Sequence, residues 1–362
     1  MTSSKKRAKP SVVIVGAGVA GAAAAVELRE AGASVTVVER EAQVGGQAGR
    51  FGCKATDVCL HCNVCVGQDL LKRAFGPDSG TRVLTSSQVA ECRRNDDGDS
   101  LELNVTSVRG KTTRLHADYV VAATGYTPFD PSSVGTYGYG LIPNVISGLD
   151  AEQAHADGRA PLTRPSDGQP AKRIAFIQCV GSRNEQAYRT PEKTDYCSTV
   201  CCSYALRMGR LAKHLNPECQ VTVFYMDIQC FGQDFADFYA ACRKEMTFVM
   251  ARPFGLAPLP GGTVAVRYED QTGGQAKEAE FDLVVLSVGM RPAAGVRDVA
   301  EALNLPVDEY GFLGAKSTLR LGAKGEGRVF VAGACEAPMS IAQTVAQARA
   351  VAGQIVARCQ SQ

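Results

Sequence analysis

A short apolar strand that runs into a glycine-rich turn constrains the fold of this chain more than any other feature. Ser11–Val15 is uniformly apolar after its first residue, Gly16-Ala17-Gly18-Val19-Ala20-Gly21 follows at once, and residues 19–31 have helical periodicity. In such a turn the first glycine permits the tight bend, the second lets a pyrophosphate approach the backbone, and the third lets helix and strand pack closely. The first N–H groups of the helix then face the phosphates. The pattern predicts a dinucleotide-binding βαβ unit.

An acidic residue stands at the end of the next expected strand. Ser34–Val38 follows a short turn at Gly32, and Glu39 lies 18 residues after Gly21. A carboxylate at this position typically accepts a hydrogen bond from a ribose 2′-hydroxyl. Because strand, helix and carboxylate agree, we expect a bound nucleotide rather than an unliganded turn.

Strands and helices alternate along the rest of the chain, which predicts the α/β class. A second strand–helix–strand pattern, at 173–178, 200–214 and 220–225, repeats the first. Meander-like strands and a closing apolar strand follow each pattern, at 119–123 and at 283–288. The chain resembles the two-domain flavin disulfide reductases in this respect. We therefore expect two Rossmann-like dinucleotide-binding domains on a thioredoxin-reductase-like FAD scaffold, with the second domain inserted into the first.

Three further segments favour FAD over NAD at the first site. Gly45-Gly46-Gln47 resembles the segment that passes the flavin in such enzymes, residues 122–125 resemble the strand-end motif that closes the nucleotide site, and residues 329–333 resemble the motif that contacts the ribityl chain. The helix after Ser340 would direct its positive N-terminus at the flavin pyrimidine. The expected cofactor-binding residues are Gly16, Gly18, Val19, Ala20, Gly21, Glu39, Arg40, Gly45, Gly46, Gln47, Val89, Ala123, Thr124, Gly125, Gly333, Ala334, Gln343 and Thr344.

The domain boundaries follow from the repeat and from a stretch rich in glycine, proline and polar residues. We expect the first part of the FAD-binding domain at 10–130, a linker at 131–170, the NAD-like domain at 171–288 and the second part of the FAD-binding domain at 289–362. In the second domain the turn reads Gln178-Cys179-Val180-Gly181-Ser182-Arg183, with one glycine. Cys179 carries a β-carbon where the first turn needs none, so we do not expect NAD(P)H to bind in the usual pose; a non-standard NAD loop is the alternative.

Fourteen cysteines are many for a chain of 362 residues, and eight of them form two groups. The first group is Cys53, Cys59, Cys62 and Cys65, and the second is Cys179, Cys197, Cys201 and Cys202. A cubane iron–sulfur cluster needs four thiolates that converge on one small volume. By local spacing the first group is attractive, because the run from Cys59 to Cys65 resembles part of a ferredoxin loop. Adjacent cysteines, as in the second group, can also serve one cluster where the backbone kinks.

The second group carries a specific resemblance. Residues 176–183 and 196–205, FIQCVGSR and YCSTVCCSYA, resemble the signature of the heterodisulfide reductase A-subunit family, as do residues 330–335 and 344–348. The chain is most similar to the short heterodisulfide-reductase-like subunit of sulfur-oxidising bacteria. The resemblance implies a four-iron–four-sulfur (4Fe-4S) cluster in the second domain, with the ligands Cys179, Cys197, Cys201 and Cys202.

The first cysteine group has several interpretations. Cys53 and Cys59 could pair as a redox disulfide, His61 could join the thiols around zinc, or the group could hold a second cluster shared with a partner subunit. Free thiols or an interfacial role rank slightly ahead of an intrinsic second cluster. Lys54 is either a residue that faces the flavin or a plain surface lysine.

Charge and hydropathy exclude other classes. The net charge of +2 gives no broad electrostatic footprint for nucleic acid. No apolar run approaches the ~20 residues of a spanning helix, and no signal peptide is evident, so we expect a cytoplasmic location with reduced thiols.

The resemblance implies an electron-transfer subunit of a heterodisulfide-reductase-like complex in oxidative sulfur metabolism, with further iron–sulfur subunits as partners and a homodimeric state. The alternatives are an NAD(P)H-dependent disulfide or polysulfide reductase and a non-catalytic FAD/zinc scaffold.

Overall fold

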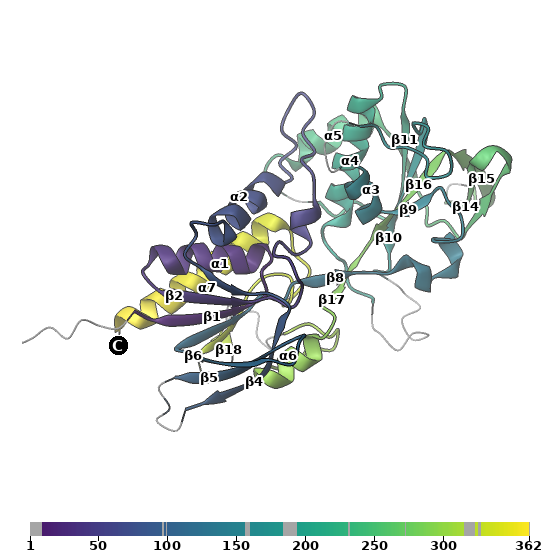
Figure 1. The fold of residues 1–362 in the computed structure, drawn as a ribbon. Helices are drawn as coiled ribbons and strands as arrows, with labels where there is room; N and C mark the ends of the chain where they lie inside the picture. Colours follow the sequence, from purple (N-terminus) through teal and green to yellow (C-terminus); the bar gives the residue numbers. More distant parts are fainter. Residues whose placement is uncertain are drawn as a thin grey trace, which may run out of the picture. The chain divides into compact units, whose positions relative to one another are not determined.

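The computed structural model describes residues 9–95, 98, 100–155, 160–183, 194–230, 232–271, 273–314, 323–324 and 327–361 (Figure 1). The chain forms two compact units. Unit 1 comprises Met1–Gly49, Asn63–Thr127 and Pro292–Gln362, and unit 2 comprises Arg50–Cys62 and Pro128–Arg291. The chain passes between them in β8 (Tyr126–Pro128) and β17 (Met290–Pro292), which form a two-stranded sheet.

Unit 1 is built on a six-stranded sheet with the order β18-β19-β7-β1-β2-β3. The strands are β1 (Ser11–Val15), β2 (Ser34–Val38), β3 (Arg82–Leu84), β7 (Tyr119–Ala122), β18 (Ala323–Lys324) and β19 (Val329–Val331). All neighbours pair in parallel except β18 and β19, which are antiparallel. The parallel centre agrees with the βαβ unit predicted from the glycine turn.

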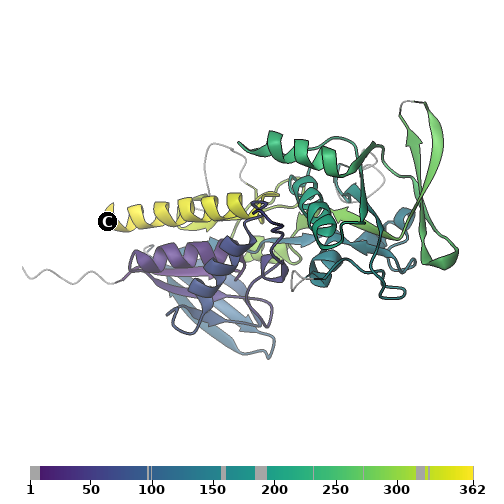
Figure 2. The same cartoon turned by 90° about the horizontal axis from the view of Figure 1, so that it is seen from above.

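Two layers cover the sheet of unit 1 (Figures 1 and 2). One layer consists of the helices α1 (Val19–Glu30), α2 (Val64–Phe75) and α7 (Ile341–Ser361), and the other of β4 (Ser87–Arg94), β5 (Leu101–Ser107), β6 (Thr112–Ala117) and α6 (Val296–Ala302). The alternation of side chains along β1 accounts for both layers. Val12 and Ile14 lie in the core beside α1 and α7, whereas Val13 and Val15 lie in the core beside β4 to β6.

Unit 2 repeats this layering. Its five-stranded sheet has the order β12-β11-β10-β16-β9 and is parallel throughout. The strands are β9 (Val145–Ser147), β10 (Arg173–Val180), β11 (Gln220–Tyr225), β12 (Thr247–Met250) and β16 (Leu283–Val288). Ile174 and Phe176 of β10 lie in one core with the helices α3 (Gly148–Ala154), α4 (Cys201–Leu215) and α5 (Phe235–Glu245). Ala175 and Ile177 lie in the opposite core, with the antiparallel sheet β13 (Gly255–Pro258), β14 (Val264–Asp270) and β15 (Gln275–Phe281).

The structure differs from the sequence expectations in three segments. Residues 131–170, expected to be a linker, contribute β9 and α3 to unit 2, apart from 156–159, which lie outside the described residues. Residues 50–62 belong to unit 2, although they follow the first βαβ pattern directly. Helix α2 is absent from the sequence expectations, because its amphipathic pattern begins within the cysteine-rich run at 59–65.

Candidate functional site

The turn after β1 has the geometry of a phosphate cradle. Gly16 adopts a φ of +113°, and a β-carbon there would lie 2.3 Å from the carbonyl oxygen of Ala123. A β-carbon on Gly21 would lie 2.0 Å from the carbonyl oxygen of Gly16. Gly18 is the N-cap of α1, and no side chain caps this helix. The first N–H groups of α1 therefore have no side-chain acceptor and can receive an anion.

Two polar side chains lie beside this turn: hydrogen bonds fix one of them, and the other has a buried oxygen without a partner. Glu39 is 9% exposed, and its carboxylate accepts hydrogen bonds from the N–H groups of Ala17 (2.7 Å) and Glu41 (2.8 Å). These bonds fix the carboxylate at the end of β2 and leave lone pairs for a ribose. The side-chain oxygen Oε1 of Gln47 is buried without a hydrogen-bond partner, which a native structure seldom leaves unexplained. Both observations fit a bound nucleotide.

The other expected cofactor residues all lie in unit 1. The peptide around Gly46 approaches Gly18, because a β-carbon on Gly46 would lie 3.1 Å from the Cα of Gly18. Gly333, with a φ of +84°, faces Ala20, and its N–H donates to Oε1 of Gln347 at 2.6 Å. Sequence reasoning missed Gln347, because its role depends on a turn 14 residues earlier.

The remaining members of that set are placed as follows. Gln343 closes the N-terminus of α7 by accepting a hydrogen bond from the N–H of Ser340. Thr344 is buried in the first turn of α7. The Arg40 side chain instead contacts Glu41 and the carbonyl of Ala294. Val19 begins α1, the N–H of Gly45 donates to the carbonyl of Ala17 at 2.9 Å, and Thr124 and Gly125 follow β7. Val89 and Ala334 are buried.

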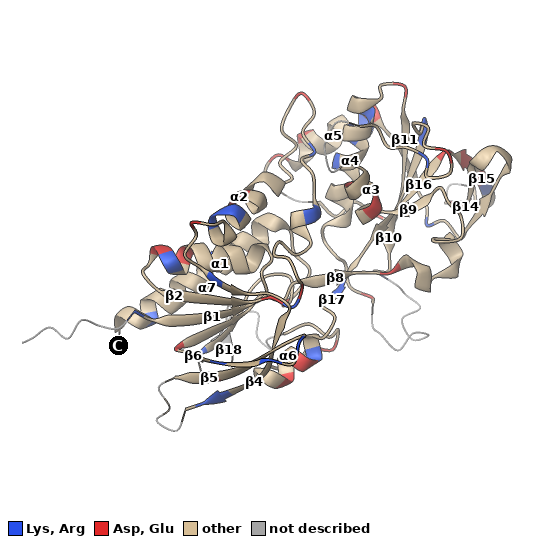
Figure 3. Cartoon of the chain, in the orientation of Figure 1, with Lys and Arg blue, Asp and Glu red and all other residues tan. Residues whose placement is uncertain are grey.

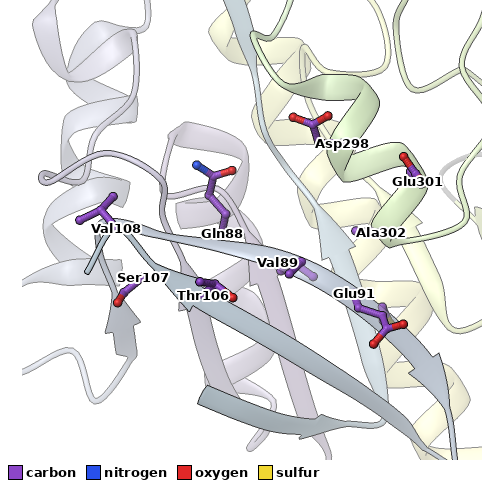
Figure 4. Close-up of a pocket in the computed structure, with 11 residues that line it drawn as sticks. Gln88, Val89, Glu91, Thr106, Ser107, Val108, Asp298, Glu301 and Ala302 are labelled. Carbon is purple, nitrogen blue, oxygen red and sulfur yellow. The ribbon is translucent and has the colours of Figure 1, made fainter. Parts of the chain in front are cut away.

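A groove of about 800 Å³ opens elsewhere in unit 1, between β4, β5 and α6 (Figure 4). Glu91 projects from β4, while Asp298 and Glu301 project from α6. Three carboxylates oppose the binding of a pyrophosphate, so this groove is not the nucleotide site. Cys92 also lines it, and burial raises the pKa of this thiol to about 11. Elsewhere basic and acidic residues are interspersed in both units (Figure 3).

The turn after β10 in unit 2 is filled by protein. A β-carbon on Gly181 would lie 2.1 Å from the ring of Phe129, so this ring packs directly on the turn. Helix α4 does not begin at the turn but at Cys201, after an intervening segment of which 184–193 lie outside the described residues. A pyrophosphate therefore finds neither the open backbone nor the adjacent helix N-terminus that unit 1 offers. This disfavours the NAD(P)H-dependent alternative.

The second cysteine group converges at the end of β10. A bulge between Ile177 and Val180 interrupts the pairing of β10 with β16, and Cys179 lies within it at a φ of 61°. Thr199 has a φ of 58°. Non-glycine residues in this region are strained, and such strain clusters at functional sites. Cys201 and Cys202 form the first turn of α4, and the Cys201 thiol hydrogen-bonds to both Cys179 and Cys202.

Two arginines and one carboxylate, Arg183, Arg252 and Asp227, act on the Cys179 thiol. The hydrogen bond from Cys201 lowers the pKa of Cys179 to about 7; burial opposes this shift, and Arg183 and Arg252 support it. The same bonds raise the pKa of Cys201 well above its usual range. Arg183 forms an ion pair with Asp227, and the N–H of Thr199 donates to the Sγ of Cys197 at 3.3 Å. Cationic and N–H donors of this kind stabilise thiolates and cluster sulfurs.

A single zinc ion and a 4Fe-4S cluster need different arrangements of ligands. Among the described residues, no three His, Cys, Asp or Glu side chains surround a point where one metal ion would bind. The zinc interpretation, which needs such a point, therefore gains no support from the first cysteine group. A 4Fe-4S cluster is a different case, because each thiolate binds a different iron atom. Four thiols from a bulged strand, a loop and a helix start fit that donor set.

The first cysteine group is divided between the units. Cys53, Cys59 and Cys62 lie in the segment of residues 50–62 of unit 2, whereas Cys65 lies in α2 of unit 1. All fourteen cysteines are free thiols, so no Cys53–Cys59 disulfide is present. Lys54, expected near the flavin or at the surface, is 3% exposed and pairs with Glu152 of α3.

Comparison with known proteins identifies relatives of this chain. Residues 14–60 match the family model of the NAD(P)-binding Rossmann-like domain. The CoB–CoM heterodisulfide reductase iron-sulfur A-subunit 2 of Methanopyrus kandleri is 38% identical over 241 residues, which cover 64% of this chain and 36% of the relative. The ferredoxin:CoB–CoM heterodisulfide reductase A-subunit of Methanosarcina mazei is 26% identical over 434 residues, which cover 98% of this chain and 54% of the relative. The chain thus spans about one third to one half of these relatives.

Solved structures share the fold. Thioredoxin reductase of T. acidophilum matches with a TM-score of 0.58 and 18% identity, over 97% of this chain and 99% of the other. The NAD-dependent persulfide reductase of A. fulgidus matches with a TM-score of 0.57 and 19% identity, over 96% of this chain and 59% of the other. These similarities confirm the predicted α/β fold on a thioredoxin-reductase-like scaffold. No helix within the described residues is both long and apolar enough to cross a membrane.

Proposed function

Because the chain is a sequence relative of the heterodisulfide reductase A-subunits, we propose that it is a flavin-dependent oxidoreductase subunit that transfers electrons between FAD and a 4Fe-4S cluster. The observation that carries the proposal is a contrast between two units of the same layering. Unit 1 keeps an open glycine turn with a fixed carboxylate, whereas unit 2 has a turn that Phe129 fills, with one cysteine in it and three cysteines after it.

FAD supplies two-electron chemistry when bound, and the residues of unit 1 account for its retention. The backbone at Gly16 and Gly18 and the uncapped start of α1 would bind the pyrophosphate. Glu39 would orient the ribose, and Gln47 would direct its unpartnered oxygen to a hydrogen-bond donor. The N-terminus of α7 would favour negative charge near it.

The cluster would be held by Cys179, Cys197, Cys201 and Cys202, and it supplies single-electron transfer when bound. The N–H of Thr199 already donates to one of these sulfurs, and Arg183 lies within electrostatic range of Cys179. Donors of this type raise the reduction potential of a cluster.

The test is the cofactor content of anaerobically reconstituted protein. We expect about four iron and four acid-labile sulfide per chain, together with FAD. Cys201→Ala should abolish the EPR signal of the reduced cluster. Cys242→Ala is the matched control, because Cys242 is likewise buried on a helix of unit 2 but lies in its hydrophobic core. A cluster signal that survives in Cys201→Ala would refute the ligand set and point to Cys53, Cys59, Cys62 and Cys65.

The partners and the pathway extend the proposal. We expect a cytoplasmic homodimer within a heterodisulfide-reductase-like complex of oxidative sulfur metabolism, with further iron–sulfur subunits that handle the sulfur substrate. The names of the relatives and the resemblance to the short subunit of sulfur oxidisers support this. Light scattering on the purified chain tests the dimer. Affinity purification from the native cells tests the complex, and recovery of the chain alone would count against it.

A further inference from the structure

We propose that Cys59 and Cys62 form a redox-active dithiol that exchanges with solvent-accessible organic disulfides, with Arg207 as its charged partner. This site lies in unit 2 and does not depend on the proposed cluster. The spacing Cys59-Leu60-His61-Cys62 is that of dithiol motifs, in which two thiols can close a disulfide without moving a domain.

Helix α4 holds the loop between the two cysteines. The Nε of Arg207 donates to the carbonyl oxygen of Leu60 at 2.7 Å, and Leu60 is 4% exposed. His61 adopts a φ of 51°, and its N–H approaches the Sγ of Cys59 at 3.4 Å. The loop is thus anchored at its middle, and a left-handed residue turns it between the two thiols.

Arg207 provides a positive charge that carboxylates do not neutralise. Arg207 is half-buried, and its guanidinium lies 5.7 Å from the ring centre of Phe238. No described carboxylate is among the groups that shift its pKa. Burial lowers the pKa of Arg207, and the groups that act against this shift are the thiols of Cys62, Cys230, Cys242 and Cys59. A sulfur that leaves as a thiolate here does so beside a cation.

The four thiols around Arg207 are not equivalent. Burial raises the pKa of Cys230 and of Cys242 to about 12, so both stay protonated at neutral pH. Cys59 is exposed and Cys62 is half-buried. We therefore assign Cys59 as the attacking thiol and Cys62 as the resolving thiol.

The exchange balances within the pair and its substrate. The Cys59 thiolate attacks one sulfur of a disulfide, the substrate S–S bond breaks, and the first substrate thiolate leaves and takes up a proton. Cys62 then loses its proton and attacks the Sγ of Cys59, which forms the protein disulfide and releases the second substrate thiol. The dithiol loses two electrons, and the substrate gains them. A small-molecule dithiol returns the pair to its reduced form by the reverse exchange.

The experiment uses the full-length holoprotein in glutathione buffers of increasing oxidation, with free thiols trapped by a maleimide and peptides analysed by mass spectrometry. We expect the wild type to form a Cys59–Cys62 disulfide that dithiothreitol reverses. Cys62→Ser should accumulate one glutathione on Cys59, whereas Cys59→Ser should lose disulfide formation. Arg207→Met should slow the exchange on the order of tenfold, because it removes the adjacent charge. Cys53→Ser is the matched control, since Cys53 lies exposed in the same segment.

Two results would overturn the proposal. One is a Cys59–Cys62 peptide that stays alkylated at both thiols in every buffer. The other is a loss of iron in both Cys59→Ser and Cys62→Ser, which would make these residues cluster ligands. The first result leaves the cluster assignment untouched, and Cys201→Ala tests that assignment by a separate readout, so the two proposals can be told apart.

Discussion

Lys54 and Glu152 form an ion pair inside unit 2, where 4% and 2% of their side-chain surfaces are exposed. Lys54 also lies 5.7 Å from the ring centres of Phe51 and Tyr204, and its Nζ donates to the carbonyl of Gly52. The pair joins residues 50–62 to α3. A buried pair is costly to break, because its remaining member is left as an uncompensated charge.

We therefore predict that Lys54→Met lowers the free energy of unfolding by about 3–5 kcal/mol. The double variant Lys54→Met/Glu152→Leu should recover most of this loss, since no charge remains buried. Urea unfolding monitored by circular dichroism measures both. Lys172→Met is the control, because Lys172 pairs with Glu218 at the surface, with 70% and 78% of the side chains exposed. Equal effects of Lys54→Met and Lys172→Met would contradict this account.

A substitution at Gly18 can test FAD binding without disturbing the fold. A β-carbon there meets no atom closer than 3.9 Å, and its φ of −83° suits any residue. Gly18→Ala should therefore fold with wild-type stability but lose FAD, because the methyl group occupies the approach of the pyrophosphate. The ratio of flavin absorbance to protein absorbance after gel filtration measures the loss. Gly353→Ala in α7, where a β-carbon meets nothing within 4 Å, should retain FAD. Full flavin content in Gly18→Ala would argue against the assigned site.

The packing of the Phe129 ring on Gly181, in the turn after β10, can be tested by substitution. Gly181→Ala should destabilise unit 2 by more than about 1 kcal/mol, since the β-carbon meets the Phe129 ring at 2.1 Å and the φ is +75°.

Because the second turn is closed, NADH and NADPH should fail to bleach the flavin of the wild type under anaerobic conditions. Rapid bleaching by either nucleotide would favour the NAD(P)H-dependent alternative.

Asp282 should make unit 2 sensitive to acid. Burial tends to raise the pKa of this carboxyl, but hydrogen bonds from the N–H groups of Arg173 and Lys172 and from the Arg173 guanidinium outweigh it and hold the pKa below its usual range. A lowered native pKa adds stability above the unfolded value and loses it as the pH falls through the native one. Asp282→Asn should therefore reduce stability at pH 7 by about 1–3 kcal/mol, and flatten its decline below about pH 4. A parallel decline in both proteins would be the contrary result.

The sequence was most informative where local chemistry dictates structure. The bend at Gly16, the start of α1 and the position of Glu39 follow from residues within one βαβ unit. The contact between Cys179 and Cys201 is harder to predict from the sequence, because it depends on a bulge in β10 and on the point where α4 begins. The resemblance supplied that ligand set; spacing alone favoured the other cysteine group.

Other features could not be read from the chain at all. Prolines and glycines between 131 and 170 suggested a linker, but β9 of that stretch pairs with β16 and completes the edge of a sheet. Lys54 reads as a surface residue until Glu152, 98 positions later, is brought beside it. Long-range pairing of this kind leaves no local signal in composition or periodicity.

Because residues 50–62 belong to unit 2, they restrict which fragments of the protein can be expressed separately. A truncated fragment made of residues 128–291 would keep every strand of its five-stranded sheet. It would nevertheless leave the carboxylate of Glu152 without a cation and strip helix α4 of the loop that Arg207 holds. Recombinant expression of this half alone therefore requires residues 50–62 to be supplied, as a fused or separate peptide.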